Sequence, residues 1–246
     1  MKQYEAVILT LERLGGVATL GQLNQEVFKL KECLWNTKTP FASIRRIVQL
    51  DKNIYKIKPG LYGLIKLRKE IESRGIIVET EKNKNSKEAV EFNHSYYQGL
   101  LLTIGNLKGL NTFVPNQDKN RKFIDSRSLA EIRTLNELPE YSFPEIVKRS
   151  STIDVIWFNQ RTMPHSFFEV EHSTDIQNSL LKFYDLQDFY TRMIIVADEI
   201  RHCEYKQKLN RGAFMEIQNR VNFLSYHSLI KQYEAEIFKT SQQFII

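Results

Sequence analysis

The segments Ser151-Thr-Ile-Asp-Val-Ile-Trp-Phe158 and Phe167-Phe-Glu-Val-Glu-His-Ser173 decide the fold of this chain. Both are rich in β-branched and aromatic residues, which favours strands. Because side chains alternate between the two faces of a strand, Glu169 and Glu171 are expected on one face and the intervening Val170 on the other. Carboxylates on an apolar strand need a cationic partner or a metal ion. The pattern therefore predicts an acidic site built on a strand.

A hairpin over residues 159–166 would bring Asp154, in the first segment, beside Glu169 in the second. Together with Glu171, these groups make three converging carboxylates, an oxygen-rich set of the kind that holds Mg²⁺. The alternative is a solvated strand edge, or ion pairs between these carboxylates and nearby Arg or Lys side chains. The apolar flanks of both segments favour the metal site.

Length and composition exclude several classes of protein. The 246 residues suffice for one large or two modest domains. The apolar run Met193–Ala197 is too short to span a bilayer, and the first residues lack the apolar stretch of a signal peptide. Cys33 and Cys203 lie far apart without CxxC spacing, so we expect reduced thiols and no zinc site. These features predict a cytoplasmic protein that does not enter membranes.

The excess positive charge lies in the first quarter of the chain. Residues 1–66 carry 11 Lys and Arg against 5 Asp and Glu, whereas residues 67–246 carry 24 of each kind. A basic module joined to a neutral one is typical of a polyanion-binding domain attached to a second domain. A Lys-rich solubilising surface is the alternative interpretation.

The first 66 residues show three helical patterns and then two short strands. Residues 2–14 have a helical period that ends at Gly15-Gly16, and Thr19 can cap a second helix. Pro40 begins a third helix, and two strands flank Pro59-Gly60. Three helices followed by a β-hairpin form the pattern of a winged helix, so residues 1–66 are expected to be a winged-helix DNA-binding domain. Residues 67–87 are expected to form a helix and a polar linker.

The remaining residues, 88–246, alternate between helical and strand patterns. A helix over 88–107 and a strand at 112–115 precede the two acidic strands. A long helix capped by Thr174-Asp175 and a buried strand over 193–198 follow, and the chain continues with more helix and strand. This order predicts an α/β (α+β) core with a mixed sheet and helices on both faces.

The order of elements and the acidic residues together resemble the PD-(D/E)xK nuclease superfamily, which has the restriction-endonuclease-like fold. Its core is helix, three strands, helix, strand. Ile153-Asp154 matches the Asp at the start of the second strand, and Glu169-Val170-Glu171 matches the third-strand motif with Glu in the usual place of Lys. The resemblance covers roughly residues 88–230.

This resemblance implies a Mg²⁺ site, with Mn²⁺ as a substitute, held by Asp154 and Glu169. Glu171 takes the role of general base or extra metal ligand. Lys182 on the next helix is the candidate for the positive charge that the motif lacks. The first helix contributes a further candidate metal ligand, Glu91, and His94 and Gln98 lie on the same helix face one and two turns later.

The N-terminal domain resembles winged helices of the HARE-HTH type. The matching residues are Leu20-Gly-Gln-Leu23, Thr39-Pro40, Ser43-Ile-Arg-Arg46 and Pro59-Gly-Leu-Tyr-Gly-Leu64. In a winged helix the third helix enters the major groove and the hairpin contacts phosphates. The residues expected to contact DNA are Thr39, Ser43, Arg45, Arg46, Lys56 and Lys58. A helix that only covers the surface, or that binds protein, is the alternative.

The sequence therefore predicts a Mg²⁺-dependent endodeoxyribonuclease of the type II restriction class. Its partner is double-stranded DNA, and cutting both strands favours a homodimer, because one active site cleaves one strand. One alternative is a non-catalytic DNA-binding regulator with a degenerate nuclease domain. A nuclease acting on RNA or on single strands is another.

Overall fold

The computed structural model describes residues 1–80, 82–84, 86–124 and 127–243. Two residues of the expected linker, Glu81 and Asn85, lie outside these ranges. The chain forms two units. The first contains Met1–Phe92, a short piece around Ile124 and the chain from Tyr233 onward; the second contains Asn93–Phe123 and Arg127–Gln232.

The first unit has the order of elements that the sequence predicted. The helices, in chain order, are α1 (Gln3–Arg13), α2 (Leu20–Glu26), α3 (Pro40–Leu50) and α4 (Arg68–Ser73), with 3-10 turns at Val27–Lys29 and Ile65–Leu67. The strands are β1 (Val17–Thr19), β2 (Ile54–Lys58) and β3 (Leu61–Leu64), which form an antiparallel sheet in the order β1-β3-β2. Thr19 caps α2 by accepting a hydrogen bond from the Gln22 N–H at 3.1 Å.

The C-terminal helix completes the first unit. This helix, α10 (Tyr226–Gln243), contributes its residues from Tyr233 onward. The Tyr233 hydroxyl lies 3.2 Å from Thr19 Oγ1 at the start of α2. At the start of α3, the Phe41 ring packs edge-on against Phe238, with 4.9 Å between centroids. The two ends of the chain therefore share one core.

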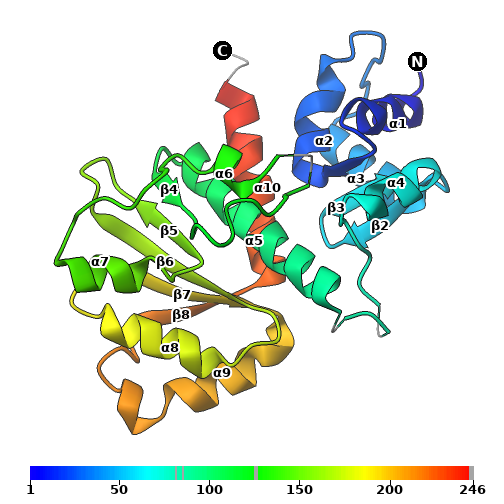
Figure 1. Ribbon diagram of the computed structural model, residues 1–246. Helices are drawn as coiled ribbons and strands as arrows, with labels where there is room; N and C mark the ends of the chain where they lie inside the picture. The colour runs from blue at the N-terminus through cyan, green and yellow to red at the C-terminus, as the bar shows by residue number, and fades with distance from the viewer. Residues whose placement is uncertain (81, 85, 125–126, 244–246) are drawn as a thin grey trace. The chain divides into compact units, whose positions relative to one another are not determined.

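The second unit contains a five-stranded mixed sheet (Figure 1). The strands are β4 (Asn111–Phe113), β5 (Val155–Phe158), β6 (Pro164–Glu171), β7 (Arg192–Ala197) and β8 (Val221–Ser225). They lie in the order β4-β5-β6-β7-β8, antiparallel from β4 to β6 and parallel from β6 to β8. The helices are α5 (Lys87–Leu107), α6 (Leu129–Ile132), α7 (Pro144–Ser150), α8 (Ile176–Asp185) and α9 (His202–Leu209), with 3-10 turns at Glu199–Arg201 and Gly212–Phe214. Helix α7 was not predicted, because residues 125–150 show no clear period.

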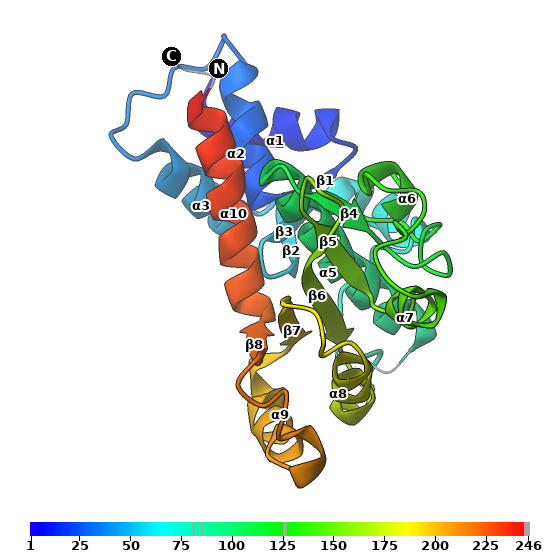
Figure 2. The same cartoon turned by 90° about the vertical axis from the view of Figure 1, so that its left-hand side faces the viewer.

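Helices cover both faces of this sheet, as the sequence predicted (Figures 1 and 2). On one face, Phe167 of β6 packs in a fully buried cluster with Leu180 and Phe183 of α8. On the other face, the Trp157 indole donates a hydrogen bond to the Leu101 carbonyl of α5 at 3.1 Å. Strand β6 therefore lies in the middle of the sheet and in the middle of the core.

Candidate active site

Three of the predicted acidic residues, Asp154, Glu169 and Glu171, gather in the second unit on β6 and at the start of β5. Asp154 directly precedes β5 and is 8% exposed. Its Oδ2 accepts a hydrogen bond from the Val170 N–H of β6 at 2.7 Å, and its carbonyl accepts one from Gln98 Nε2 at 3.2 Å. The antiparallel pairing of Val155 with Phe168 produces this placement. The hairpin thus fixes Asp154 against the strand that carries the two glutamates.

Glu169 is buried and is held by helix α8. Lys182 Nζ lies 2.8 and 3.1 Å from the two Glu169 carboxylate oxygens, and Ser179 Oγ donates to Glu169 Oε2 at 3.0 Å. Ser179 and Lys182 are three residues apart, so they share one face of the helix. Lys182 also donates to the Thr152 carbonyl at 2.8 Å, close to Asp154 in the chain. The lysine therefore connects Glu169 to the segment that carries Asp154.

Burial and neighbouring charges shift the pKa values of Glu169 and Lys182. Burial and the negative charge of Asp154 raise the pKa of Glu169, although Lys182 opposes this shift. For Lys182, burial lowers the pKa, but the charges of Glu169 and Asp154 outweigh it and the net pKa is raised. Burial is thus the first cause of the raised pKa of Glu169, and the Asp154 charge is the second.

Glu171 has partners of its own. Its carboxylate accepts hydrogen bonds from Ser179 and from Thr174, and Arg201 Nη1 lies 3.9 Å from it. Ser179 Oγ thus lies within hydrogen-bonding distance of both glutamates, and its single proton is donated to one of them at a time. Glu169 and Glu171 share a face, as the strand alternation predicted, but the side chains around them differ.

His94, expected only to share a helix face with Glu91, and Asp118, which was not predicted as a ligand, lie beside Asp154. His94 Nε2 on α5 is 3.4 Å from Asp154 Oδ1 and 3.7 Å from Asp118 Oδ2, and Asp118 lies in the turn after β4. One potential ligand atom from each of the three residues lies within 4.8 Å of the other two. Gln98, a predicted site residue, donates to Asp118 Oδ2 at 2.9 Å. The four-residue spacing of His94 and Gln98 on one helix face was the available signal.

His94 lies between Asp154 and Asp118, whose negative charges favour its protonated form. Burial would lower the pKa of His94, but the Asp154 charge and hydrogen bonds to Asp118 and Asp154 outweigh it and raise the pKa to about 10. Burial acts to raise the pKa of Asp118, yet hydrogen bonds from His94 and Gln98 lower it overall. Without a metal ion, His94 is therefore an imidazolium ion near neutral pH.

The predicted metal ligand Glu91 is not among these three converging groups. It belongs to the part of α5 grouped with the first unit, its side chain is about half exposed (48%), and Lys87 Nζ lies 3.9 Å from its carboxylate. Its role as a ligand remains a prediction.

The predicted DNA-contacting residues lie in the first unit, with different exposure. Arg46 and Lys56 are exposed, and so is Thr39, whereas Ser43 is half-buried. Arg45 is exposed but donates to Glu234 of α10 at 2.9 Å. Lys58 is buried: its Nζ lies 3.5 Å from Glu79 and 5.5 Å from the centre of the Phe92 ring, and burial lowers its pKa. Arg45 and Lys58 are therefore already engaged within the unit.

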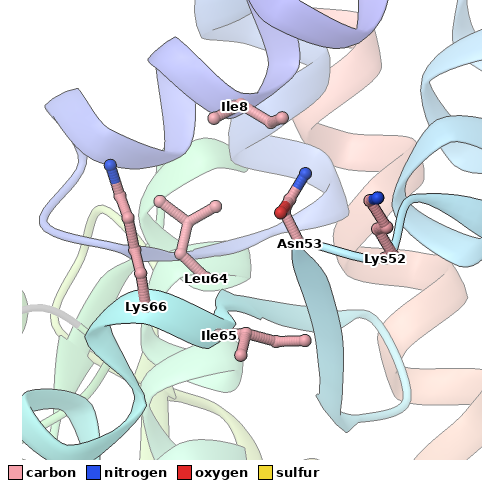
Figure 3. A pocket seen from close by; sticks show the side chains of 6 residues that line it. All are labelled: Ile8, Lys52, Asn53, Leu64, Ile65 and Lys66. Atoms are coloured by element: carbon pink, nitrogen blue, oxygen red, sulfur yellow. The ribbon is translucent and has the colours of Figure 1, made fainter.

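The first unit also has a surface pocket of about 370 Å³ (Figure 3). Apolar side chains of α1 and β3 meet two lysines there, and the lining residues are Ile8, Lys52, Asn53, Leu64, Ile65 and Lys66. The pocket has no carboxylate in its lining and none of the predicted DNA-contacting residues. The candidate active site is therefore the acidic cluster of the second unit and not this pocket.

A family model named for the C-terminal domain of the type II restriction enzyme NmeDI matches residues 76–245. The chain belongs to this family. The match includes all of the second unit, with the residues around Asp154, Glu169 and Lys182. Type II restriction enzyme NmeDI of Neisseria meningitidis serogroup C is 30% identical over 129 residues. That alignment covers 48% of this chain and 36% of NmeDI, so the chain matches well under half of its relative.

No solved structure matches the chain. Within the described ranges, no helix has both the length and the apolar character needed to cross a membrane.

Proposed function

We propose that this protein is a metal-dependent endonuclease of restriction type that hydrolyses phosphodiester bonds in double-stranded DNA. One observation carries the proposal: buried Glu169 is paired with Lys182, and Asp154 is hydrogen-bonded to the neighbouring Val170 N–H, on the mixed sheet of a chain from a restriction-enzyme family. Each comes from the element that the superfamily resemblance assigned to it. The relative that bears the name of a type II restriction enzyme supports the same class.

In this proposal Lys182 replaces the lysine that the third-strand motif lacks. The Lys182 side chain is 22% exposed, so it lies between the buried Glu169 and solvent. A positive group fixed at this position would stabilise the negative charge that develops on the phosphate during attack by water. Its hydrogen bond to the Thr152 carbonyl fixes the ammonium group in place.

The donor set suits Mg²⁺, with Mn²⁺ as a substitute. Asp154 and Glu169 supply the carboxylate oxygens that hard cations prefer. Burial, and after it the Asp154 charge, raises the pKa of Glu169, and a bound cation would favour its ionised form. A bound cation would supply Lewis-acid activation of the phosphate and of water. Glu171 would act as general base or as a further ligand, and Ser179 would keep the two glutamates oriented.

We further propose that the first unit is a winged helix that binds the target DNA. The exposed residues at the start of α3 and on β2 support this role: Thr39, Arg46 and Lys56, with half-buried Ser43 beside them. Arg45 would need to exchange Glu234 for a phosphate or base, whereas buried Lys58 is left out of the surface. A homodimer would place two active sites on the two strands.

The test is cleavage of mixed plasmid and genomic DNA, methylated and unmethylated, with and without Mg²⁺. The wild-type chain should cut only with the metal, and Glu169→Gln should abolish cutting while DNA binding persists. Glu199→Gln, an exposed glutamate on the 3-10 turn after β7, is the matched control and should cut normally. Absence of cleavage on every substrate would refute the proposal, and preferential cleavage of RNA would move the enzyme to another class.

A second candidate is a DNA-binding regulator without catalysis. The observations that favour it are the glutamate at the usual lysine position and the ion pair that already engages Glu169. In that case Glu169→Gln would change neither cleavage, which would be absent, nor DNA affinity. The same assay therefore separates the two candidates.

A further inference from the structure

Three side chains from separate parts of the second unit converge on one point beside Asp154. His94 comes from α5, Asp118 from the turn after β4, and Asp154 from the residue before β5. All are buried or nearly so, with side-chain exposures of 19%, 3% and 12%. Ligand atoms from different elements that lie within 4.8 Å of one another are close enough to be bridged by one cation.

The two carboxylates are oriented by the protein itself. Asp154 Oδ2 accepts the Val170 N–H at 2.7 Å, while Oδ1 lies toward His94 at 3.4 Å. Asp118 Oδ1 lies 3.2 Å from Arg121 Nε, while Oδ2 lies toward His94 at 3.7 Å. Each aspartate therefore has one oxygen held by a donor and the other toward the imidazole, although Asp118 Oδ2 also accepts a hydrogen bond from Gln98 Nε2 at 2.9 Å. Such outer partners orient the ligands of metal sites.

A fourth side chain gives an independent indication of a ligand. Gln98 is fully buried, and its Nε2 donates to Asp118 and to the Asp154 carbonyl. Within the described part of the chain, its Oε1 has no hydrogen-bond donor. A buried acceptor without a donor is commonly explained by a water molecule or ion. This one belongs to an amide that lies against both aspartates.

We propose that His94, Asp118 and Asp154 form a second cation site, of the first-row transition-metal type. An imidazole nitrogen with two carboxylates suits Mn²⁺, Co²⁺ or Zn²⁺ better than Mg²⁺ or Ca²⁺, which prefer oxygen alone. The site shares Asp154 with the Asp154–Glu169 pair. The inference rests on the proposed function only where it treats Asp154 and Glu169 as the catalytic pair. Metal binding at the second site is measured separately from cleavage.

The experiment uses the full chain, stripped of metal and titrated with Mn²⁺ in excess Mg²⁺. Electron paramagnetic resonance reports free Mn²⁺, and pulsed spectra of the bound ion report coupling to imidazole nitrogen. The wild type should retain Mn²⁺ against Mg²⁺ and show nitrogen coupling. His94→Gln and Asp118→Asn should each weaken Mn²⁺ binding by at least about 100-fold, because loss of a mere outer partner already costs roughly 10–100-fold. His227→Gln, at an exposed histidine, is the matched control and should bind normally.

The inference would be overturned if both variants bound Mn²⁺ as the wild type does. It would also be overturned if Mn²⁺ bound to the wild-type chain showed no coupling to nitrogen. The coupling is measured on the wild type, so it decides the question even if the variants fail to fold. Loss of Mn²⁺ binding in Glu169→Gln but not in His94→Gln would also overturn it, because the metal would then lie only at the Asp154–Glu169 pair. If the chain binds Mn²⁺ through His94 but cuts no DNA, the second cation site stands and the proposed nuclease function is refuted.

Discussion

In metal-free protein, raising the pH should remove the stabilisation that His94 contributes. The pKa of His94 is about 10 in the folded chain, against 6.5 in an unfolded one. Because the folded-state value is the higher, the stabilisation is fully present below pH 6.5 and is lost as the pH rises through 10. At about 1.4 kcal/mol per pKa unit, the full effect is about 5 kcal/mol at most. Between pH 6.5 and 9, the free energy of unfolding should lose about 3 kcal/mol of this stabilisation.

Denaturant unfolding of wild type and His94→Gln, in the presence of a chelator, measures this effect. The stability difference between the two proteins should shrink as the pH rises, since all other titrating groups are common to both. Nuclear magnetic resonance of the five histidines gives a direct check, because one ring should remain protonated at pH 8 and its signal should vanish in His94→Gln. A difference that stays constant from pH 6.5 to 9, or a His94 ring that titrates near 6.5, would refute the reasoning.

Three further predictions follow from packing and charge. Lys182→Met removes the cation 2.8 Å from buried Glu169, so we expect cleavage to fall at least about 100-fold, as for loss of one oriented charge-stabilising donor. Gly105→Ala would place a Cβ 2.5 Å from Thr112 and 2.7 Å from Trp157, which should lower the free energy of unfolding by about 1–3 kcal/mol in thermal or denaturant melts. Arg46→Ala should weaken duplex binding and reduce the slope of log affinity against log salt by about one.

Each of these substitutions has a matched control. Lys206→Met removes an exposed lysine of α9 and should leave cleavage unchanged. Gly212→Ala adds a Cβ with no atom within 4 Å and should leave stability nearly unchanged. Arg13→Ala removes an exposed arginine of α1 and should leave the salt slope unchanged. A control that behaves like its test variant would mean that the assay reports something other than the stated contact.

Local patterns were enough to predict most of the elements. Thr19 and Pro40 begin helices for reasons of capping and fixed backbone geometry, and the alternation around Val170 set both faces of β6. Helix α7 was missed because its seven residues are too short to show a period. The contribution of α10 to the first unit was missed because contacts between distant segments leave no mark on spacing.

Some residues of the candidate site could likewise be predicted from the sequence, and others could not. The strand motif led to Asp154 and Glu169, and the superfamily resemblance led to Lys182 on the next helix, whose Nζ lies 2.8 Å from Glu169. His94 and Asp118 were not selected, because neither lies on the acidic strands and their proximity depends on how α5 crosses the sheet. An aspartate in a turn is usually a turn residue, and only the folded arrangement distinguishes this one.

The contacts of α10 with the first unit have a consequence for how such modules move between genes. Thr19, Arg45 and Phe41 all meet residues that the chain supplies more than 180 positions later. A fragment ending near residue 66 would leave the apolar side of α2 and α3 bare and should be prone to aggregate. Recombination that exchanges only residues 1–66 would therefore create a mismatched surface, so the exchange would require a compatible α10.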